Sequence, residues 1–164
     1  TTVADYLHWI EDAFVLFTVR LFDASYRRSN SNPKKIYCIY HSLVTSVGSG
    51  ILVNSGHLLD NIVFLALRRT SEHVYYCRCR SGREVDSLVQ GSDRSRRLVQ
   101  VCESMSREKT RKREITALQD ARAESGLSSA TIVTRSENDR ISFDTGQIEI
   151  LPAWQSLLHL PSYR

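Results

Sequence analysis

The segment Ser81-Gly-Arg-Glu-Val-Asp-Ser-Leu-Val89 decides the fold that we expect for this chain. Ser81-Gly82 is typical of a turn, and a strand is predicted from Glu84 to Val89. Side chains alternate between the two faces of a strand, so the carboxylates of Glu84 and Asp86 point to the same face. A face that carries two acids can hold a divalent cation. The pattern therefore makes Glu84 and Asp86 candidate metal ligands.

Two further predicted strands flank this segment and form a short meander with it. They cover His73 to Arg78 and Arg97 to Cys102. In the second of them, Gln100 and Cys102 share one face, which adjoins the face of the two acids if the strands pair. A buried, structural role is the alternative interpretation of Gln100 and Cys102.

A helix predicted over Leu58 to Arg69 precedes the meander and adds the acid Asp60. The helix is apolar on most of its circumference, which indicates that it is buried. Metal-dependent phosphodiesterases position Mg²⁺, a water molecule and the scissile phosphate with a helix acid, a strand acid, and an acid or amide followed two residues later by lysine. Asp60, Asp86 and Gln100 supply parts of this arrangement.

The rest of the chain predicts an α/β fold of the α+β kind. A helix from Val3 to Phe14, a strand over Val15 to Leu21, a polar turn over Arg27 to Pro33 and a strand over Lys35 to Tyr40 open the chain. A helix followed by a β-ribbon suggests the tail of a winged helix. The remaining expected elements are a loop over Gly48 to Gly56, a helix from Ser106 to Glu124 that stops at Gly126, strands over Ala130 to Thr134 and Gln147 to Leu151, and a helical turn after Pro152.

Size and composition favour a folded, globular protein. The 164 residues, of which 41% are hydrophobic and 24% charged, suffice for one sizeable domain or for one domain with part of a neighbour. The longest apolar stretch, Leu58 to Leu67, is too short to cross a bilayer, so we expect no membrane partner. The four cysteines lie in strand-like apolar segments, which favours reduced thiols and a cytoplasmic location. The chain enters a helical pattern directly at Thr1 and is expected to be a fragment of a larger protein.

Several segments together resemble one protein family. They are Tyr6-Leu-His-Trp-Ile-Glu-Asp-Ala13, Lys34-Lys-Ile-Tyr37, Leu58-Leu-Asp-Asn-Ile-Val-Phe64, Gly82-Arg-Glu-Val-Asp86, Leu98-Val-Gln-Val-Cys102, Arg111 to Leu118, and Ile150-Leu-Pro-Ala-Trp154. They resemble the C-terminal PD-(D/E)XK nuclease-like domain, preceded by a winged helix, of prokaryotic AAA-type P-loop ATPases, a domain long classed as one of unknown function. The resemblance implies a restriction-endonuclease-like αβββαβ core over residues 46–164. Residues 1–45 would then be a winged-helix remnant with its connecting strands.

The resemblance also implies roles for individual residues. Asp60 stands where such proteins usually carry a helix glutamate, Asp86 matches the metal-binding aspartate, and Gln100 matches the first position of the (D/E)XK element. Cys102 stands where an active nuclease has lysine, and a thiol lacks the permanent positive charge that helps to hold a phosphate. The implied site is therefore degenerate, with Asp60, Asp86 and Gln100 as its catalytic residues.

The resemblance implies Mg²⁺ or Mn²⁺ as the cofactor, with Asp86 as a metal ligand, and the strand spacing adds Glu84 as a possible second ligand. The chain contains no Gly-x-x-x-x-Gly-Lys-Ser/Thr motif, so we expect no ATP site within it. ATP would bind only in the N-terminal part of the parent protein, and the ATPase domain of that parent is an expected partner.

A cluster of positive charge marks the start of the helix predicted from Ser106. The chain has a net charge of +4 and a pI near 9.0. Positive charge at a helix start opposes the helix dipole, so helix stability does not explain the cluster. Contact with nucleic-acid phosphates is one interpretation. Intrahelical ion pairs with Glu108 and Glu114 are the other, and both stay open. The cluster consists of Arg107, Lys109, Arg111, Lys112 and Arg113.

Three functions are compatible with these features. The leading hypothesis is a non-catalytic or weakly active nuclease-like domain that provides the nucleic-acid or partner contact of an ATPase. The second is an active Mg²⁺-dependent deoxyribonuclease in which a displaced Lys or Arg replaces the lysine missing at Cys102. The third is a protein-interaction or oligomerisation domain, which would make the protein a homo-oligomer.

Overall fold

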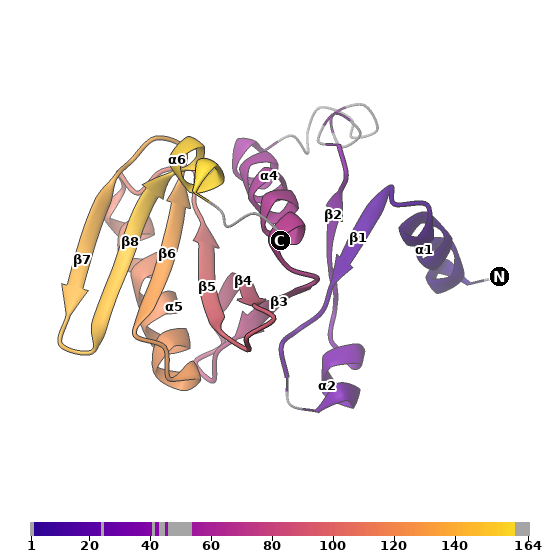
Figure 1. The fold of residues 1–164 in the computed structure, drawn as a ribbon, viewed down its shortest axis with the longest axis horizontal. Helices are drawn as coiled ribbons and strands as arrows, with labels where there is room; N and C mark the ends of the chain where they lie inside the picture. Colours follow the sequence, from indigo (N-terminus) through magenta and orange to yellow (C-terminus); the bar gives the residue numbers. More distant parts are fainter. Residues whose placement is uncertain (1, 24, 41, 43–44, 46–53, 160–164) are drawn as a thin grey trace.

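The computed structural model describes residues 2–23, 25–40, 42, 45 and 54–159. Most of the loop predicted from Gly48 to Gly56 lies outside the described residues. Figure 1 shows a six-stranded sheet, a two-stranded sheet and the helices around them. The expected α+β fold class is confirmed. No helix in the described ranges is long and apolar enough to cross a membrane.

The six-stranded sheet is built on the predicted meander. β3 (His73–Arg78), β4 (Glu84–Gln90) and β5 (Arg96–Val101) pair antiparallel in sequence order. α5 (Glu108–Ser125) then crosses over to β6 (Ser129–Thr134), which lies parallel to β5. The helix ends at Gly126, whose φ of 69° is left-handed, as the sequence predicted.

Two more strands complete this sheet. β8 (Gly146–Pro152) lies parallel to β6, and β7 (Asp139–Phe143) lies antiparallel to β8. The strand order is β3-β4-β5-β6-β8-β7. β7 was not among the strands predicted from the sequence; it is an edge strand in which no residue is buried. An edge strand tolerates polar residues, and a strand without an apolar run is not predicted from hydrophobic periodicity.

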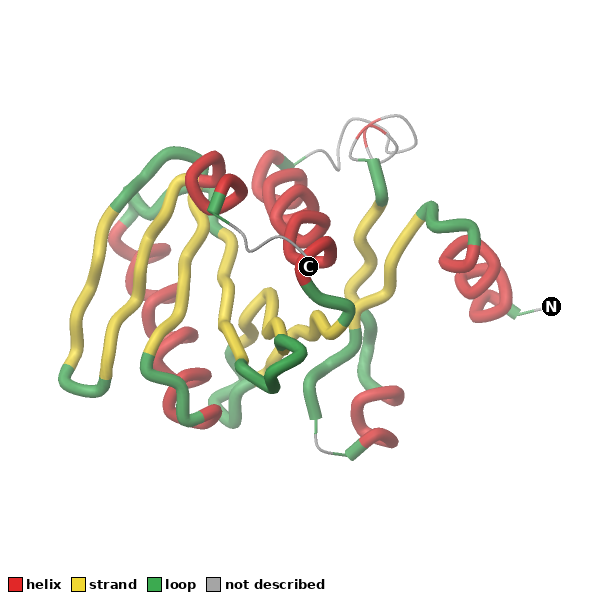
Figure 2. The backbone as a smooth tube through the Cα atoms, in the orientation of Figure 1, coloured by secondary structure: helices red, strands yellow, loops and turns green. Residues whose placement is uncertain are grey.

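Helices cover both faces of the sheet, as Figures 1 and 2 show. α5 lies behind the sheet in this view, whereas α4 (Ser55–Thr70) and α6 (Ala153–Leu158) lie in front. The alternation of side chains along the strands divides the core in the same way. In β6, Val133 belongs to the hydrophobic cluster between the sheet and α4, whereas Ile132 belongs to the cluster between the sheet and α5.

The N-terminal elements form a helix and a ribbon, as expected. α1 (Val3–Asp12) is followed by β1 (Leu16–Val19), which pairs antiparallel with β2 (Lys35–Cys38). None of the residues of α1 is buried, and Tyr6 and Trp9 are each 55% exposed. The interpretation of these elements as a winged-helix remnant stays a prediction.

The stretch Arg27 to Pro33 is not the turn that the sequence predicted. It contains the short helix α2 (Tyr26–Ser31). The Ser25 side chain accepts a hydrogen bond from Arg28 N as the N-cap. The Ser29 hydroxyl donates to Leu21 O at 2.7 Å and anchors the helix to the preceding segment. A helix this short has no apolar period, so the prediction was wrong.

The ribbon is joined to the six-stranded sheet through a continuous core. Leu21 forms a parallel bridge with Tyr76 of β3, and the Tyr76 hydroxyl donates to Pro33 O at 2.6 Å. Tyr37 of β2 stacks on Phe64 of α4 with ring centroids 4.0 Å apart. One hydrophobic cluster therefore contains residues from both sides of position 45. The division into domains at this position stays a prediction.

Candidate functional site

Asp86 lies at a β-bulge in β4. Between the pairs Tyr75–Leu88 and Cys77–Val85, β4 has one residue more than β3. A bulge changes the direction in which neighbouring side chains point. Val85 and Leu88 consequently pack in the same core against α5 although they are three residues apart. Asp86 points away from that core, toward β2.

Asp86 and Gln100 complete the pairing of β4 and β5 with their side chains. The regular ladder between these strands ends at Ser87 and Val99. Beyond this point, Asp86 N donates to Gln100 Oε1 at 3.1 Å, and Val101 N donates to Asp86 Oδ2 at 3.0 Å. The side chains thus satisfy backbone N–H groups that the ladder leaves without partners. The structure brings these two predicted site residues together.

Lys35 of β2 reaches Asp86 from the ribbon. Lys35 Nζ lies 2.7 Å from Asp86 Oδ1, and the two side chains are 25% and 19% exposed. The ammonium group also lies over the Tyr76 ring, 5.8 Å from its centroid. Burial lowers the pKa of Lys35, but the surrounding carboxylates, Asp86 foremost, raise it, and the net pKa lies above its ordinary value. Lys35 is therefore a charged partner of Asp86.

Asp60 of α4 supplies a second acid beside Asp86. The Tyr37 hydroxyl donates to Asp60 Oδ2 at 3.1 Å. Asp60 Oδ1 is buried and has no hydrogen-bond partner among the described residues. Burial raises the pKa of Asp60 to about 7; the charge of Asp86 acts in the same direction and that of Lys35 opposes it. Asp60 is therefore protonated more readily than an ordinary aspartate.

A buried carboxylate from α5 stands next to Gln100. Gln100 is 7% exposed and Glu114 is 4% exposed. Gln100 Nε2 donates to Glu114 Oε2 at 2.8 Å, and the Arg113 guanidinium pairs with the other Glu114 oxygen. The Gln100 amide is thus held at both ends, by Asp86 and by Glu114, which fixes its orientation.

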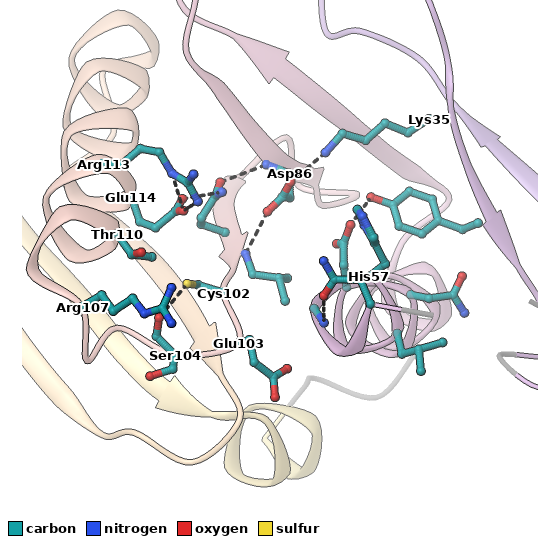
Figure 3. Close-up of a pocket in the computed structure, with 18 of the residues that line it drawn as sticks. Lys35, His57, Asp86, Cys102, Glu103, Ser104, Arg107, Thr110, Arg113 and Glu114 are labelled. Carbon is teal, nitrogen blue, oxygen red and sulfur yellow. Dashed lines mark hydrogen bonds and ion pairs between the residues drawn. The ribbon is translucent and has the colours of Figure 1, made fainter. Parts of the chain in front are cut away.

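These groups line a cavity of about 1010 Å³. Figure 3 shows Lys35 directed at Asp86, Arg113 directed at Glu114, and Arg107 and Thr110 on the same side of the cavity as Arg113. A cavity with convergent polar groups and a shifted carboxyl pKa is typical of a functional site. The charged lining is mixed, with the cations Lys35, Arg107 and Arg113 and the acids Asp60, Asp86, Glu103 and Glu114.

Cys102 contributes no charge to this cavity. Its side chain is 9% exposed, and its Sγ donates to Ser104 O at 3.2 Å. Burial raises the pKa of the Cys102 thiol above its ordinary value, so the group is a neutral thiol. The position that the resemblance assigns to lysine is therefore uncharged, as the sequence indicated.

The residues around Asp86 do not fit a divalent metal ion. Glu84, the second predicted metal ligand, pairs at 2.6 Å with Arg78 and does not join Asp86. Both Asp86 oxygens, the Gln100 oxygen and one Asp60 oxygen already accept hydrogen bonds from protein groups. In the part of the chain that the structure describes, no group of three or more His, Cys, Asp or Glu side chains could hold a metal.

The five cations predicted for nucleic-acid contact fall into two groups. Arg111 pairs with Asp139 of β7 at 2.5 Å, and Arg113 pairs with its neighbour Glu114. Ion pairs of Glu108 or Glu114 with residues three or four positions away are absent from the described α5. The cations that are exposed and have no ion-pair partner among the described residues are Arg107, Lys109 and Lys112.

A comparison with models of protein families identifies most of this region. Residues 55–155, from the first turn of α4 into α6, match the family described as "Domain of unknown function (DUF4143)". The chain belongs to this family. The DUF4143 match contains Asp60, Asp86, Gln100 and Glu114 but ends short of Lys35. The site therefore combines DUF4143 residues with a lysine from outside the matched range.

A relative extends the similarity over the N-terminal elements. An uncharacterized protein of Methanocaldococcus jannaschii is 30% identical over 163 residues, which cover 93% of this chain and 35% of the relative. The chain thus spans about a third of the length of that relative. No solved structure gave a significant match. The DUF4143 assignment agrees with the expected domain of unknown function and assigns no activity.

Sequence reasoning missed three residues of the site: Lys35, Tyr37 and Glu114. Glu114 carried a detectable signal, because it precedes Leu118 by four residues and therefore lies on the apolar face of α5. An acid on such a face requires a buried polar partner. Lys35 carried no comparable signal, since its role depends on how β2 packs against the six-stranded sheet.

Proposed function

We propose that this chain is a nuclease-like domain that does not cleave and that contacts the phosphate backbone of a nucleic acid through the start of α5. The observation that carries the proposal is the set of exposed cations without ion-pair partners in the described chain, Arg107, Lys109 and Lys112. Arg107 is also the N-cap of α5 and makes no side-chain capping bond, so backbone N–H groups point outward beside these cations.

The degenerate site supports the non-cleaving part of the proposal. Phosphodiester cleavage in this class of fold needs a metal ion and a nearby permanent positive charge. Cys102 supplies no charge, and the oxygens of Asp86 and Gln100 are engaged by protein groups. Binding through α5 requires neither of these features.

The longer relative supports the proposed setting. The chain spans about a third of that relative, so the remaining two thirds of the relative's length leave room for an ATPase domain. We place this domain at the C-terminal end of an AAA-type ATPase, whose ATPase domain is its partner, as the sequence resemblance implies. Four free cysteines are compatible with the cytoplasm as its location.

Salt-dependent binding tests the proposal. Fluorescence anisotropy with labelled single-stranded DNA, duplex DNA and RNA should show affinity that falls steeply with salt. Replacing Arg107, Lys109 and Lys112 together by alanine should reduce the slope of log K against log salt by about 2 to 3. The matched control replaces three exposed cations elsewhere: Arg27, Lys34 and Arg69. A flat salt response, or equal loss in both triple variants, would refute the proposal.

An active deoxyribonuclease is the second candidate, and Lys35 is the observation that favours it. Lys35 Nζ at 2.7 Å from Asp86 is a displaced lysine beside the predicted metal-binding aspartate. The discriminating experiment follows Mn²⁺-dependent cutting of plasmid and single-stranded DNA by wild type and Asp86→Ala. Cutting that is lost in Asp86→Ala would establish the second candidate, whereas wild type that binds but does not cut supports the first.

A further inference from the structure

A lysine stands where the resembled fold would hold a metal ion. Asp60 and Asp86 are the acids of the predicted nuclease site, and the cation that contacts Asp86 here is the ammonium group of Lys35, to which the charge of Asp60 is also attracted. Its Nζ lies 2.7 Å from Asp86 Oδ1. The two side chains are mostly buried, so their attraction is less screened by water and salt than that of a surface pair.

The ribbon holds this ammonium group in place. Lys35 pairs with Val19 in the small sheet, and the next inward residue of β2, Tyr37, stacks on Phe64. The Tyr76 ring faces the ammonium at 5.8 Å, and the Tyr76 hydroxyl binds Pro33 O, two residues before the lysine. The position of Lys35 is therefore fixed by the packing of β2, so its contact with Asp86 differs from a chance ion pair of a mobile surface side chain.

One carboxylate oxygen of the two acids has no hydrogen-bond donor among the described residues. Asp60 Oδ1 is buried without a hydrogen-bond partner among the described residues, while Asp60 Oδ2 binds the Tyr37 hydroxyl. A divalent cation that used this oxygen together with Asp86 Oδ1 would come close to the Lys35 ammonium. Like charges at such short separations repel strongly inside a protein. Lys35 and a metal ion thus exclude each other at the same carboxylates.

We propose that the Lys35 ammonium group, paired with Asp86 beside Asp60, takes the place of a divalent metal ion at these two carboxylates and prevents metal ions from binding there. The inference concerns the carboxylate pair alone and does not depend on the nucleic-acid contact proposed for α5. Neutralising Lys35 should therefore open a latent divalent-cation site whose ligands are Asp86 and Asp60.

Mn²⁺ titration followed by electron paramagnetic resonance and calorimetry tests this inference. Lys35→Met keeps most of the aliphatic stem and removes the charge. It should bind Mn²⁺ more tightly than wild type by on the order of tenfold or more. Lys35→Met/Asp86→Asn should lose that binding, and Lys35→Arg, which retains the charge, should behave as wild type. Lys34→Met is the matched control, since Lys34 is exposed and adjacent.

Wild-type protein provides an independent check if Lys35→Met does not fold. Wild type and Asp86→Asn should give the same Mn²⁺ titration, because Asp86 binds no metal while Lys35 is present. Wild-type binding that Asp86→Asn abolishes would overturn the inference. It would also be overturned by a folded Lys35→Met that binds Mn²⁺ no more tightly than wild type, whatever the outcome of the DNA-binding experiments.

Discussion

The side-chain amide of Asn61 forms two hydrogen bonds with the backbone of Cys38. Cys38 N donates to Asn61 Oδ1 at 2.8 Å, and Asn61 Nδ2 donates to Cys38 O at 2.9 Å. Asn61 belongs to α4 and is 5% exposed, whereas Cys38 is the last residue of β2. The amide thus takes the place of a neighbouring strand for the end of the ribbon and helps to fix β2, including Lys35, against α4.

Asn61→Ala should destabilise the protein by about 2 to 4 kcal/mol, because it removes two hydrogen bonds and leaves backbone groups of Cys38 without partners. Urea unfolding followed by circular dichroism measures the change. Asn138→Ala is the control, since Asn138 is exposed and its side-chain amide donates to Gln155 Oε1, at 3.2 Å, where water can replace the partner. Asn138→Ala should change stability by less than about 0.5 kcal/mol. Equal effects of the two substitutions would contradict the structural role of Asn61.

The raised pKa of Asp60 should make stability depend on pH. The carboxyl has a pKa of about 7 in the folded protein and an ordinary value of 3.8 in the unfolded chain. Within this window the folded state binds a proton that the unfolded state releases, so the free energy of unfolding falls as pH rises and levels off above about pH 7. Asp60→Asn cannot titrate and should lack this contribution.

Urea unfolding of wild type and Asp60→Asn from about pH 5 to about pH 8 tests this expectation. The stability of Asp60→Asn relative to wild type should increase with pH across the window. Titrating groups that do not interact with Asp60 cancel in this difference, since both proteins contain them. Parallel stability curves would show that Asp60 titrates at its ordinary pKa.

Exchanging the partners at positions 100 and 114 should reveal how the buried carboxylate is accommodated. Gln100→Glu alone places a second carboxylate against Glu114 and should cost about 1 to 3 kcal/mol, because two like charges then share a buried contact. Gln100→Glu/Glu114→Gln restores one acid and one amide and should recover most of the loss. A double-mutant cycle by urea unfolding measures this coupling. Additive effects would contradict the direct contact between the two side chains.

Gly146 should not tolerate a side chain. Its φ is 133°, and a Cβ would lie 1.8 Å from Ser128 O and 2.4 Å from Arg122 Nη2. Gly146→Ala should therefore cost more than about 3 kcal/mol. Gly82→Ala is the control, since Gly82 has a φ of 81° but no atom within 4 Å of an added Cβ, and it should cost only about 1 to 2 kcal/mol. Thermal unfolding of both variants distinguishes a steric clash from backbone strain alone.

The periodic elements of this fold could be predicted from the sequence, and its exceptions could not. The predicted meander placed Asp86 and Gln100 on neighbouring strands, where the structure has them. The bulge that directs Asp86 toward the ribbon could not be predicted from the alternation of side chains in β4, because it arises from the pairing of β4 with β3. β7 was missed because an exposed edge strand does not need apolar residues.

The contacts of the candidate site were even harder to predict from the sequence than the bulge and the edge strand. Lys35 and Asp86 are 51 positions apart in sequence, and their contact exists only because the ribbon packs on α4 and β3. Local patterns indicate which residues lie on the exposed or buried face of an element, but they do not indicate which element from a distant part of the chain packs against that face. The ion pair between Lys35 and Asp86 is therefore a property of tertiary packing.

The clamp between Asn61 and Cys38 has a practical consequence for defining the protein in the laboratory. A polypeptide cut to residues 55–155 would keep the family signature but lose β2, which packs against α4. Phe64 would lose its stacking partner, and the Asp60–Asp86 pair would lose its counter-ion. The stretch that the family model matches is shorter than the stretch that closes the core, so expression boundaries should be drawn to include the ribbon.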